Sequence, residues 1–178
     1  MPTKMIGQKS AIWWIPESVY ASGPPATLSL ATLSAAITAN TMVNLTPAIA
    51  QGYTLNPTDS DTEDAKSVAD SGNAQSRGAY NFEANIPFFR EDDPTTNTTS
   101  IFLKAYTLFK SGHVYGYLAQ RIGYPYNTAL AVGQKLSVYH VCSDYPRDER
   151  AGDAGGPILF RVPFGQQGWM VKHQAIVT

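Results

Sequence analysis

The chain has 178 residues, of which 43% are hydrophobic and 15% are charged, and its net charge is −1 at pH 7. This length fits one domain over residues 1–178, and the weakly charged composition suits a protein that buries much of its surface against copies of itself, although it also fits an ordinary neutral monomer. The near-neutral charge disfavours tight nucleic-acid binding, the single cysteine excludes an internal disulfide, and no apolar run approaches the about 18 residues of a membrane-spanning helix.

The first predicted element is a short strand or docking arm at Ala11–Ile15, which ends at Pro16. Neighbouring residues of a strand point to opposite faces, so we expect one of Trp13 and Trp14 to enter the core and the other to meet a partner. A loop clamped by the two rings is the alternative. Residues 1–16 lack the charged start and apolar stretch of a secretion signal, so we expect a soluble protein that stays inside the cell until it is assembled.

The next segment, Leu28–Leu45, mixes Thr, Ser and Ala with scattered apolar residues. Its first half fits a helix or a strand, and both interpretations stay open. Met42–Leu45 and Tyr53–Leu55 are predicted to be extended, because Thr, Val and Tyr are frequent there and prolines interrupt the chain nearby.

Residues 56–77 are polar and offer almost nothing apolar to bury. They predict a long mobile loop in the free subunit. Compact domains seldom keep an unstructured loop of this length, so the segment is either disordered or folds against another molecule. We favour the second alternative, because long loops in compact domains usually carry function.

Alternation of apolar and polar residues predicts a strand at Tyr80–Phe89. One helix is expected to begin with Asp93 as its N-cap and to close at Gly112, since its apolar residues fall on one helical face. Further strands are predicted at residues 114–122, 136–143, 158–164 and 168–177, the last two joined as a hairpin through residues 165–168.

No catalytic constellation is present in the sequence. Residues 152–157 resemble the stretch around the nucleophile of chymotrypsin-like serine proteases, but Ala154 occupies the position of the serine and has no oxygen for attack on a carbonyl. We interpret this Gly-rich stretch as a turn. His113, His140 and His173 lack the spacing of metal ligands. The sequence therefore predicts neither an enzyme nor a cofactor or metal site.

A mixed-charge cluster follows the strand predicted at residues 136–143. Paired carboxylates can act as acid and base, but beside arginines in a Gly- and Pro-containing loop we expect solvated or intersubunit ion pairs instead. The candidates for intersubunit charge contacts are Asp144, Arg147, Asp148, Glu149 and Arg150.

Several sequence segments, in their order along the chain, resemble segments of the tail tube (major tail) proteins of long-tailed bacteriophages, particularly those that infect actinobacteria. They are VNLTPAI at 43–49, SRGAYNFEA at 76–84 and GYLAQRIG at 116–123, followed by AVGQKLSVY at 131–139 and a terminal hairpin. The resemblance spans most of the chain.

This resemblance implies a mainly β (α+β) fold, in which two packed antiparallel β-sheets form a sandwich or partial barrel beside one α-helix. It also implies hexameric rings that stack into a tube, through which DNA passes without specific binding. The loop at about 56–77 would become ordered on the neighbouring ring. The implied candidates for ring-stacking contacts are Asp59, Asp61, Glu63, Asp64 and Asp70.

The resemblance further implies that the protein lies in the virion tail after synthesis in the host bacterial cytoplasm. The implied partners are further copies of the chain, a tape measure protein, a tail terminator and distal tail proteins. Two alternatives stay open. One is a related tube protein of a contractile injection or secretion system, a head-decoration protein or a head-tail joining protein. The other is a β-barrel module that binds a carbohydrate or small ligand through Trp13, Trp14, Trp169 and the tyrosines.

Overall fold

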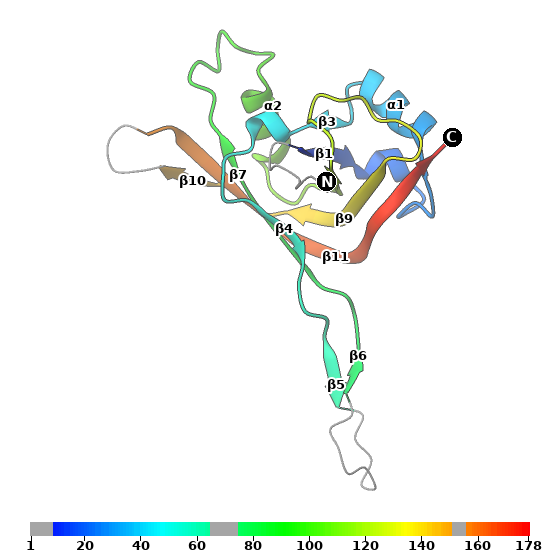
Figure 1. Cartoon of the computed structure of the whole chain (residues 1–178). Helices are drawn as coiled ribbons and strands as arrows, with labels where there is room; N and C mark the ends of the chain where they lie inside the picture. The colour runs from blue at the N-terminus through cyan, green and yellow to red at the C-terminus, as the bar shows by residue number, and fades with distance from the viewer. Residues whose placement is uncertain (1–8, 65–74, 151–155) are drawn as a thin grey trace, which may run out of the picture.

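A computed structural model describes residues 9–64, 75–150 and 156–178. Two α-helices are present in these ranges, α1 (Leu30–Thr38) and α2 (Ile101–Phe109), and the other regular elements are strands and short 3₁₀ turns (Figure 1). The strands are β1 (Ser10–Pro16), β2 (Leu28–Ser29), β3 (Val43–Asn44), β4 (Thr54–Pro57), β5 (Thr62–Asp64), β6 (Gln75–Arg77), β7 (Phe82–Phe89), β8 (Tyr115–Ile122), β9 (Lys135–Ser143), β10 (Arg147–Arg150) and β11 (Ile158–Val177).

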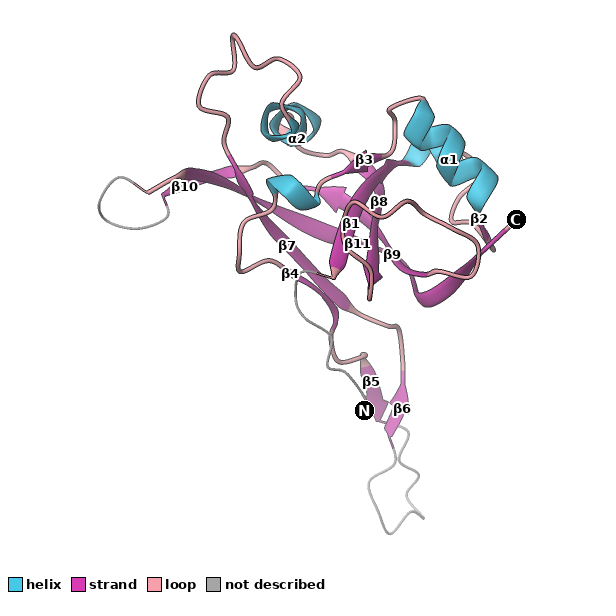
Figure 2. Cartoon of the chain, turned by 45° about the horizontal axis from the view of Figure 1, so that its top comes forward, coloured by secondary structure: helices cyan, strands magenta, loops and turns pink. Residues whose placement is uncertain are grey.

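Nine of these strands form one continuous sheet in the order β3-β1-β8-β9-β11-β7-β4, with β10 and β2 also paired to β11. Every pairing is antiparallel except that of β2 with β11. The mainly β fold expected from the sequence is confirmed. The two expected layers, however, belong to a single sheet that curves over itself without closing into a barrel (Figure 2).

The curvature depends on β11, which runs unbroken for 20 residues. Its first part pairs with β7 from Leu159 to Phe164, and its later part pairs with β9 from Phe164 to Ala175. The prediction of a terminal hairpin was wrong. The register with β9 shifts between Gln166 and Met170, and Gly168 takes a positive φ of 70°, so the Gly-Gln-Gln-Gly segment produces a bulge and a bend instead of a reversal.

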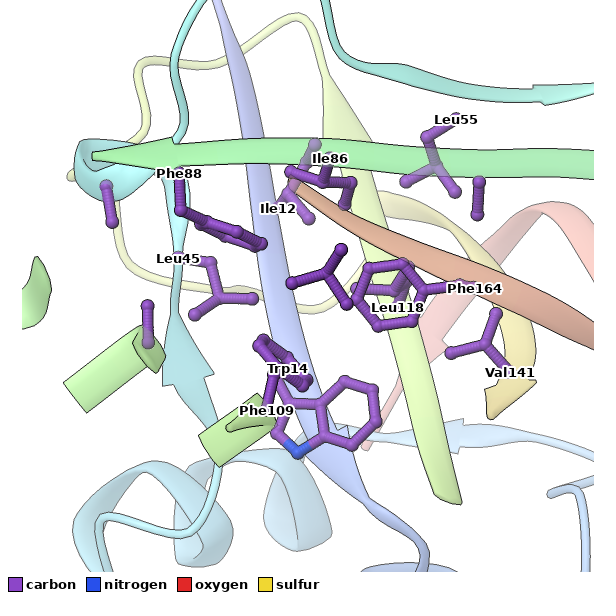
Figure 3. Close-up of a cluster of buried hydrophobic side chains, with 14 of the residues drawn as sticks. Ile12, Trp14, Leu45, Leu55, Ile86, Phe88, Phe109, Leu118, Val141 and Phe164 are labelled. Atoms are coloured by element: carbon purple, nitrogen blue, oxygen red, sulfur yellow. The ribbon is translucent and has the colours of Figure 1, made fainter. Parts of the chain in front are cut away.

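The inner face of the curved sheet encloses the larger core (Figure 3). Trp14 of β1 meets Phe109 of α2 edge to face, with ring centroids 5.0 Å apart, and Phe88 of β7 stacks on Phe109 at 5.8 Å. Aromatic pairs in these geometries stabilise beyond the area they bury. The helix α2 thereby closes the open side of the inner core.

A second core lies on the opposite face of β1, β8 and β9, where α1 covers the sheet. Trp13 packs there with Leu33 of α1, so the helical alternative for residues 30–38 is the one the structure adopts. Trp13 and Trp14 are 4% and 1% exposed. The expectation that one ring meets a partner was therefore wrong, because the strand is buried on both faces, as its unbroken apolar sequence would require.

The predicted helix at residues 93–112 is shorter than expected. It begins at Ile101, and its N-cap is Ser100, whose hydroxyl accepts a hydrogen bond from the Phe102 amide. Asp93 caps a separate turn instead. Hydrogen bonds from Thr95 and Thr96 hold the pKa of the Asp93 carboxyl at about 2. The intervening Thr and Asn residues have low helix propensity, which accounts for the late start.

Gly116 of β8 lies close against β1, with the Trp14 ring and the Ile15 backbone beside it. A Cβ atom at this position would lie 2.5 Å from a ring carbon of Trp14 and 2.6 Å from the carbonyl oxygen of Ile15. We expect Gly116→Ala to lower the free energy of unfolding by about 1–3 kcal/mol, because the backbone and the Trp14 ring would have to shift. Denaturant unfolding measures this change. The matched control is Gly165→Ala, where the nearest atom would lie 3.9 Å away; an equal loss in both variants would contradict the packing argument.

Candidate assembly surfaces

A two-stranded arm projects from the body of the protein (Figure 1, Figure 2). The pairing of β4 with β7 continues outward, because Thr58 donates from its amide to Asn81 at 2.9 Å and Asp61 donates to Ala79 at 3.1 Å. The ladder then passes into β5 and β6, where Thr62 pairs with Arg77. We define the arm as residues 58–64 and 75–81, which form an extension of the sheet instead of the irregular loop expected from the sequence.

The base of the arm is tied to the bend of β11 by side-chain amides. Asn81 donates to the carboxylate of Asp61 at 2.8 Å and accepts a hydrogen bond from Gln166 at 2.9 Å. The side-chain oxygen of Gln166 also accepts from the Phe82 amide at 3.0 Å. These bonds fix the direction in which the arm leaves the body. No local sequence pattern predicts this network, since Asn81 and Gln166 lie 85 residues apart.

The acidic residues proposed for ring stacking fall at different places along the arm. Asp59 and Asp61 lie on its stem, and the side chain of Asp61 is engaged by Asn81. Glu63 and Asp64 belong to β5. Asp70 lies outside the described residues. Four of the five candidates are thus carried by the arm, on strands or directly before them.

The mixed-charge cluster lies on and before β10, which pairs with the start of β11. Two of its members make ion pairs within the chain: Glu149 lies 2.8 Å from Arg161, and Asp148 lies 3.6 Å from Arg90. Asp144 and Arg147 are exposed, and Arg150 is the last residue of β10. The Gly-rich stretch interpreted as a turn lies mostly outside the described residues, because residues 151–155 are not described.

The histidines do not gather into a site. His140 lies 3.4 Å from Glu17 and stacks on Tyr117 with centroids 4.7 Å apart, which fits a residue of the core wall. Within the described ranges no group of three or more His, Cys, Asp or Glu residues is placed to hold a metal ion. Neither of the two helices seen there has the length and apolar character needed to span a membrane.

A groove of about 750 Å³ opens at the start of β1. We call it the edge groove; its walls include Lys9, Ser10, Ile12, Thr46, Ile49, Tyr53 and Tyr126. Tyr53 and Tyr126 are 36% and 45% exposed. The tryptophans are not part of it: Trp13 and Trp14 are buried, and Trp169 packs against the second core. The ligand-binding alternative is therefore wrong in its use of Trp13 and Trp14, because both rings are buried; the groove instead exposes two tyrosines.

One wall of the edge groove is held by a buried arginine that sequence reasoning missed. Arg121 of β8 is fully buried. Its guanidinium donates to the carbonyls of Pro125 and Thr128 at 2.8 Å each and to the side-chain oxygen of Gln134 at 2.9 Å. Burial lowers the pKa of the Arg121 guanidinium. One feature of the sequence could have indicated this buried position. Arg121 lies two residues after Ala119, so the two side chains share a strand face that is otherwise apolar.

Comparisons with known proteins bear on the whole chain. A search of curated proteins found no match. One similar structure is a chain of the cryo-EM structure of the anti-feeding prophage (AFP) baseplate, 6-fold symmetrised. The match covers 97% of the present chain and 98% of the baseplate chain, with a TM-score of 0.53. The two sequences are 10% identical, so this likeness concerns the fold alone. A family model described as phage tail tube protein matches residues 1–178. The chain therefore belongs to the phage tail tube protein family.

Proposed function

We propose that the chain forms hexameric rings that stack into the tail tube through which viral DNA passes to the host, with residues 1–178 acting as one tail tube domain. The observation that carries this proposal is the arm. It leaves the body as a paired ladder, and its base is fixed by Asn81 and Gln166. An element held in a defined direction away from its own core is suited to reach another subunit.

The arm supplies the proposed contact between rings. Its acidic candidates Asp59, Asp61, Glu63 and Asp64, with Asp70 beyond the described strands, would meet the neighbouring ring. Asp144, Arg147, Asp148, Glu149 and Arg150 remain candidates for charge contacts between subunits. Ring order six is supported by the 6-fold symmetry of the baseplate with the similar chain.

The proposed partners follow from the position of a tube in the tail. Further copies of the chain would form its wall, a tape measure protein would occupy its lumen, and a tail terminator and distal tail proteins would bind its ends. DNA would pass without specific binding, since a chain of net charge −1 provides no excess of cations for phosphates. Synthesis in the host cytoplasm would precede assembly into the virion of a long-tailed phage.

A second candidate function has its own supporting observation. The structural likeness to a chain of the anti-feeding prophage baseplate favours a tube-like or baseplate component of a contractile injection system. Such a component would form a short ring stack instead of a long tube. The length of the assembly therefore separates the two candidates.

Electron microscopy of the concentrated purified chain tests the proposed function. We expect long tubes or stacked rings of uniform diameter, because the arm provides a contact that repeats along an axis. Single rings that do not stack would favour the second candidate. A chain that stays monomeric at every concentration would contradict both.

A further inference from the structure

At the start of β1, the main chain that faces the edge groove has no partner among the described residues. Ile12 directs its backbone away from β8: its amide donates to the hydroxyl of Thr46 at 2.8 Å, and its carbonyl accepts from Leu45 at 2.9 Å. Ser10 lies two residues earlier, so its N–H and C=O point to the same side. No described residue pairs with Ser10 there, since β3 pairs only with Trp13 and Trp14. Within the part of the chain that the structure describes, the groove thus contains an open strand edge.

The walls beside this open edge are preformed. Arg121 binds the carbonyls of Pro125 and Thr128, and Asn44 donates to the carbonyl of Tyr126 at 2.9 Å. The loop after β8 is therefore fixed from two sides, while the Tyr126 side chain remains 45% exposed. A rigid wall with exposed aromatic side chains loses little conformational freedom when it binds a partner.

The chemistry of the groove matches a segment of this chain. Lys9 is the one charged residue among the described residues that line it. The arm is extended, its paired strands leave outer edges with backbone groups, and its stem carries the exposed Asp59. An arm strand could continue the sheet beside Ser10 and bring a carboxylate toward Lys9. Addition of an extended strand to an open sheet edge is a common mode of recognition.

We propose that the edge groove binds the arm of a second copy of this chain by strand addition at Ser10. This inference rests on the proposed function, because it names the surface that receives the stacking arm. Tyr53 and Tyr126 would flank the added strand, and Arg121 would hold the wall that carries Tyr126.

A photocrosslinker at position 53 tests the occupant directly. Benzoylphenylalanine replaces Tyr53, tubes are assembled and irradiated, and adducts are mapped by mass spectrometry. We expect a dimeric adduct between position 53 and the arm, residues 58–64 or 75–81, of another copy. Adducts confined to one chain, adducts to another part of a second copy, or tubes without adducts would overturn the proposal. Failure of the wild-type chain to form tubes would instead contradict the proposed function on which it rests.

Ser10→Pro tests the strand addition itself. Proline removes the N–H that points into the groove and leaves the bonds of β1 to β8 in place, since edge strands tolerate proline. We expect the concentration needed for tube assembly to rise about fivefold or more, which corresponds to one lost hydrogen bond per contact. Ser10→Ala keeps the N–H and is the matched control. Equal assembly by the two variants, with equal unfolding midpoints, would overturn strand addition.

Discussion

Replacement of residues 60–79 by an Asn-Gly turn is expected to abolish tube assembly and to leave a folded subunit. Asp59 and Tyr80 would then be joined by the two residues that favour a tight hairpin. The pairing of β4 with β7 stays intact, and the hydrogen bond of Thr58 with Asn81 at 2.9 Å is retained. None of the described residues among 60–79 belongs to the inner or the second core. Sedimentation velocity and electron microscopy at matched concentrations measure the loss.

The control for this replacement is the stability of the subunit. Because the described strands of the arm contribute no residue to either core, we expect the denaturant midpoint to change little, and the fluorescence of the buried Trp13 and Trp14 to be preserved. Tubes of normal length from the shortened chain would contradict the role of the arm. A shortened chain that unfolds would require a milder variant, Asn81→Ala, which breaks the ties to Asp61 and Gln166 and keeps the strands.

Arg121→Met is expected to lower the free energy of unfolding by about 3 kcal/mol or more. The substitution leaves the carbonyls of Pro125 and Thr128 and the side chain of Gln134 without their donor, and each buried polar group without a partner costs about 1–3 kcal/mol. Guanidinium unfolding gives the stability. Limited proteolysis of the loop between β8 and β9 shows whether the wall of the edge groove has opened.

Two further arginine variants separate this effect from a loss of charge. Arg121→Lys keeps a cation but offers a single ammonium in place of the guanidinium fork, so we expect it to recover only part of the stability. Arg147→Met removes a charge from an exposed position and should change the stability little. Equal effects at positions 121 and 147 would contradict the assignment of Arg121 as the residue that holds the loop.

Much of the fold could be predicted from local patterns. Tyr80–Phe89 alternates between apolar and polar residues, and the structure places β7 there at Phe82–Phe89. The unbroken apolar run at Ala11–Ile15 is a strand buried on both faces. The family resemblance is confirmed over residues 1–178. The prediction that the chain is not an enzyme is confirmed as well, because the phage tail tube family is a structural one.

The remaining features depend on contacts between distant residues. β11 bends because its first part pairs with β7 and its later part pairs with β9 on the other edge. The Gly-Gln-Gln-Gly segment alone does not reveal these pairings. The helix α1 depends on the second core, where Leu33 packs with Trp13. The polar residues Thr62–Asp64 and Gln75–Arg77 show no apolar pattern in the sequence, yet their backbones pair as β5 and β6. Amino-acid composition predicts which segments can be buried, and it does not predict which backbone segments pair.

Contacts between stacked rings are proposed to build the tube from this chain. Cryo-electron microscopy of the assembled wild-type chain tests this proposal. We predict six subunits around an open axial channel in each ring, with the arm of each subunit crossing to the adjacent ring. Rings of another order would contradict the hexamer. An arm that folds back on its own subunit, or stacks held together without it, would contradict the account of assembly.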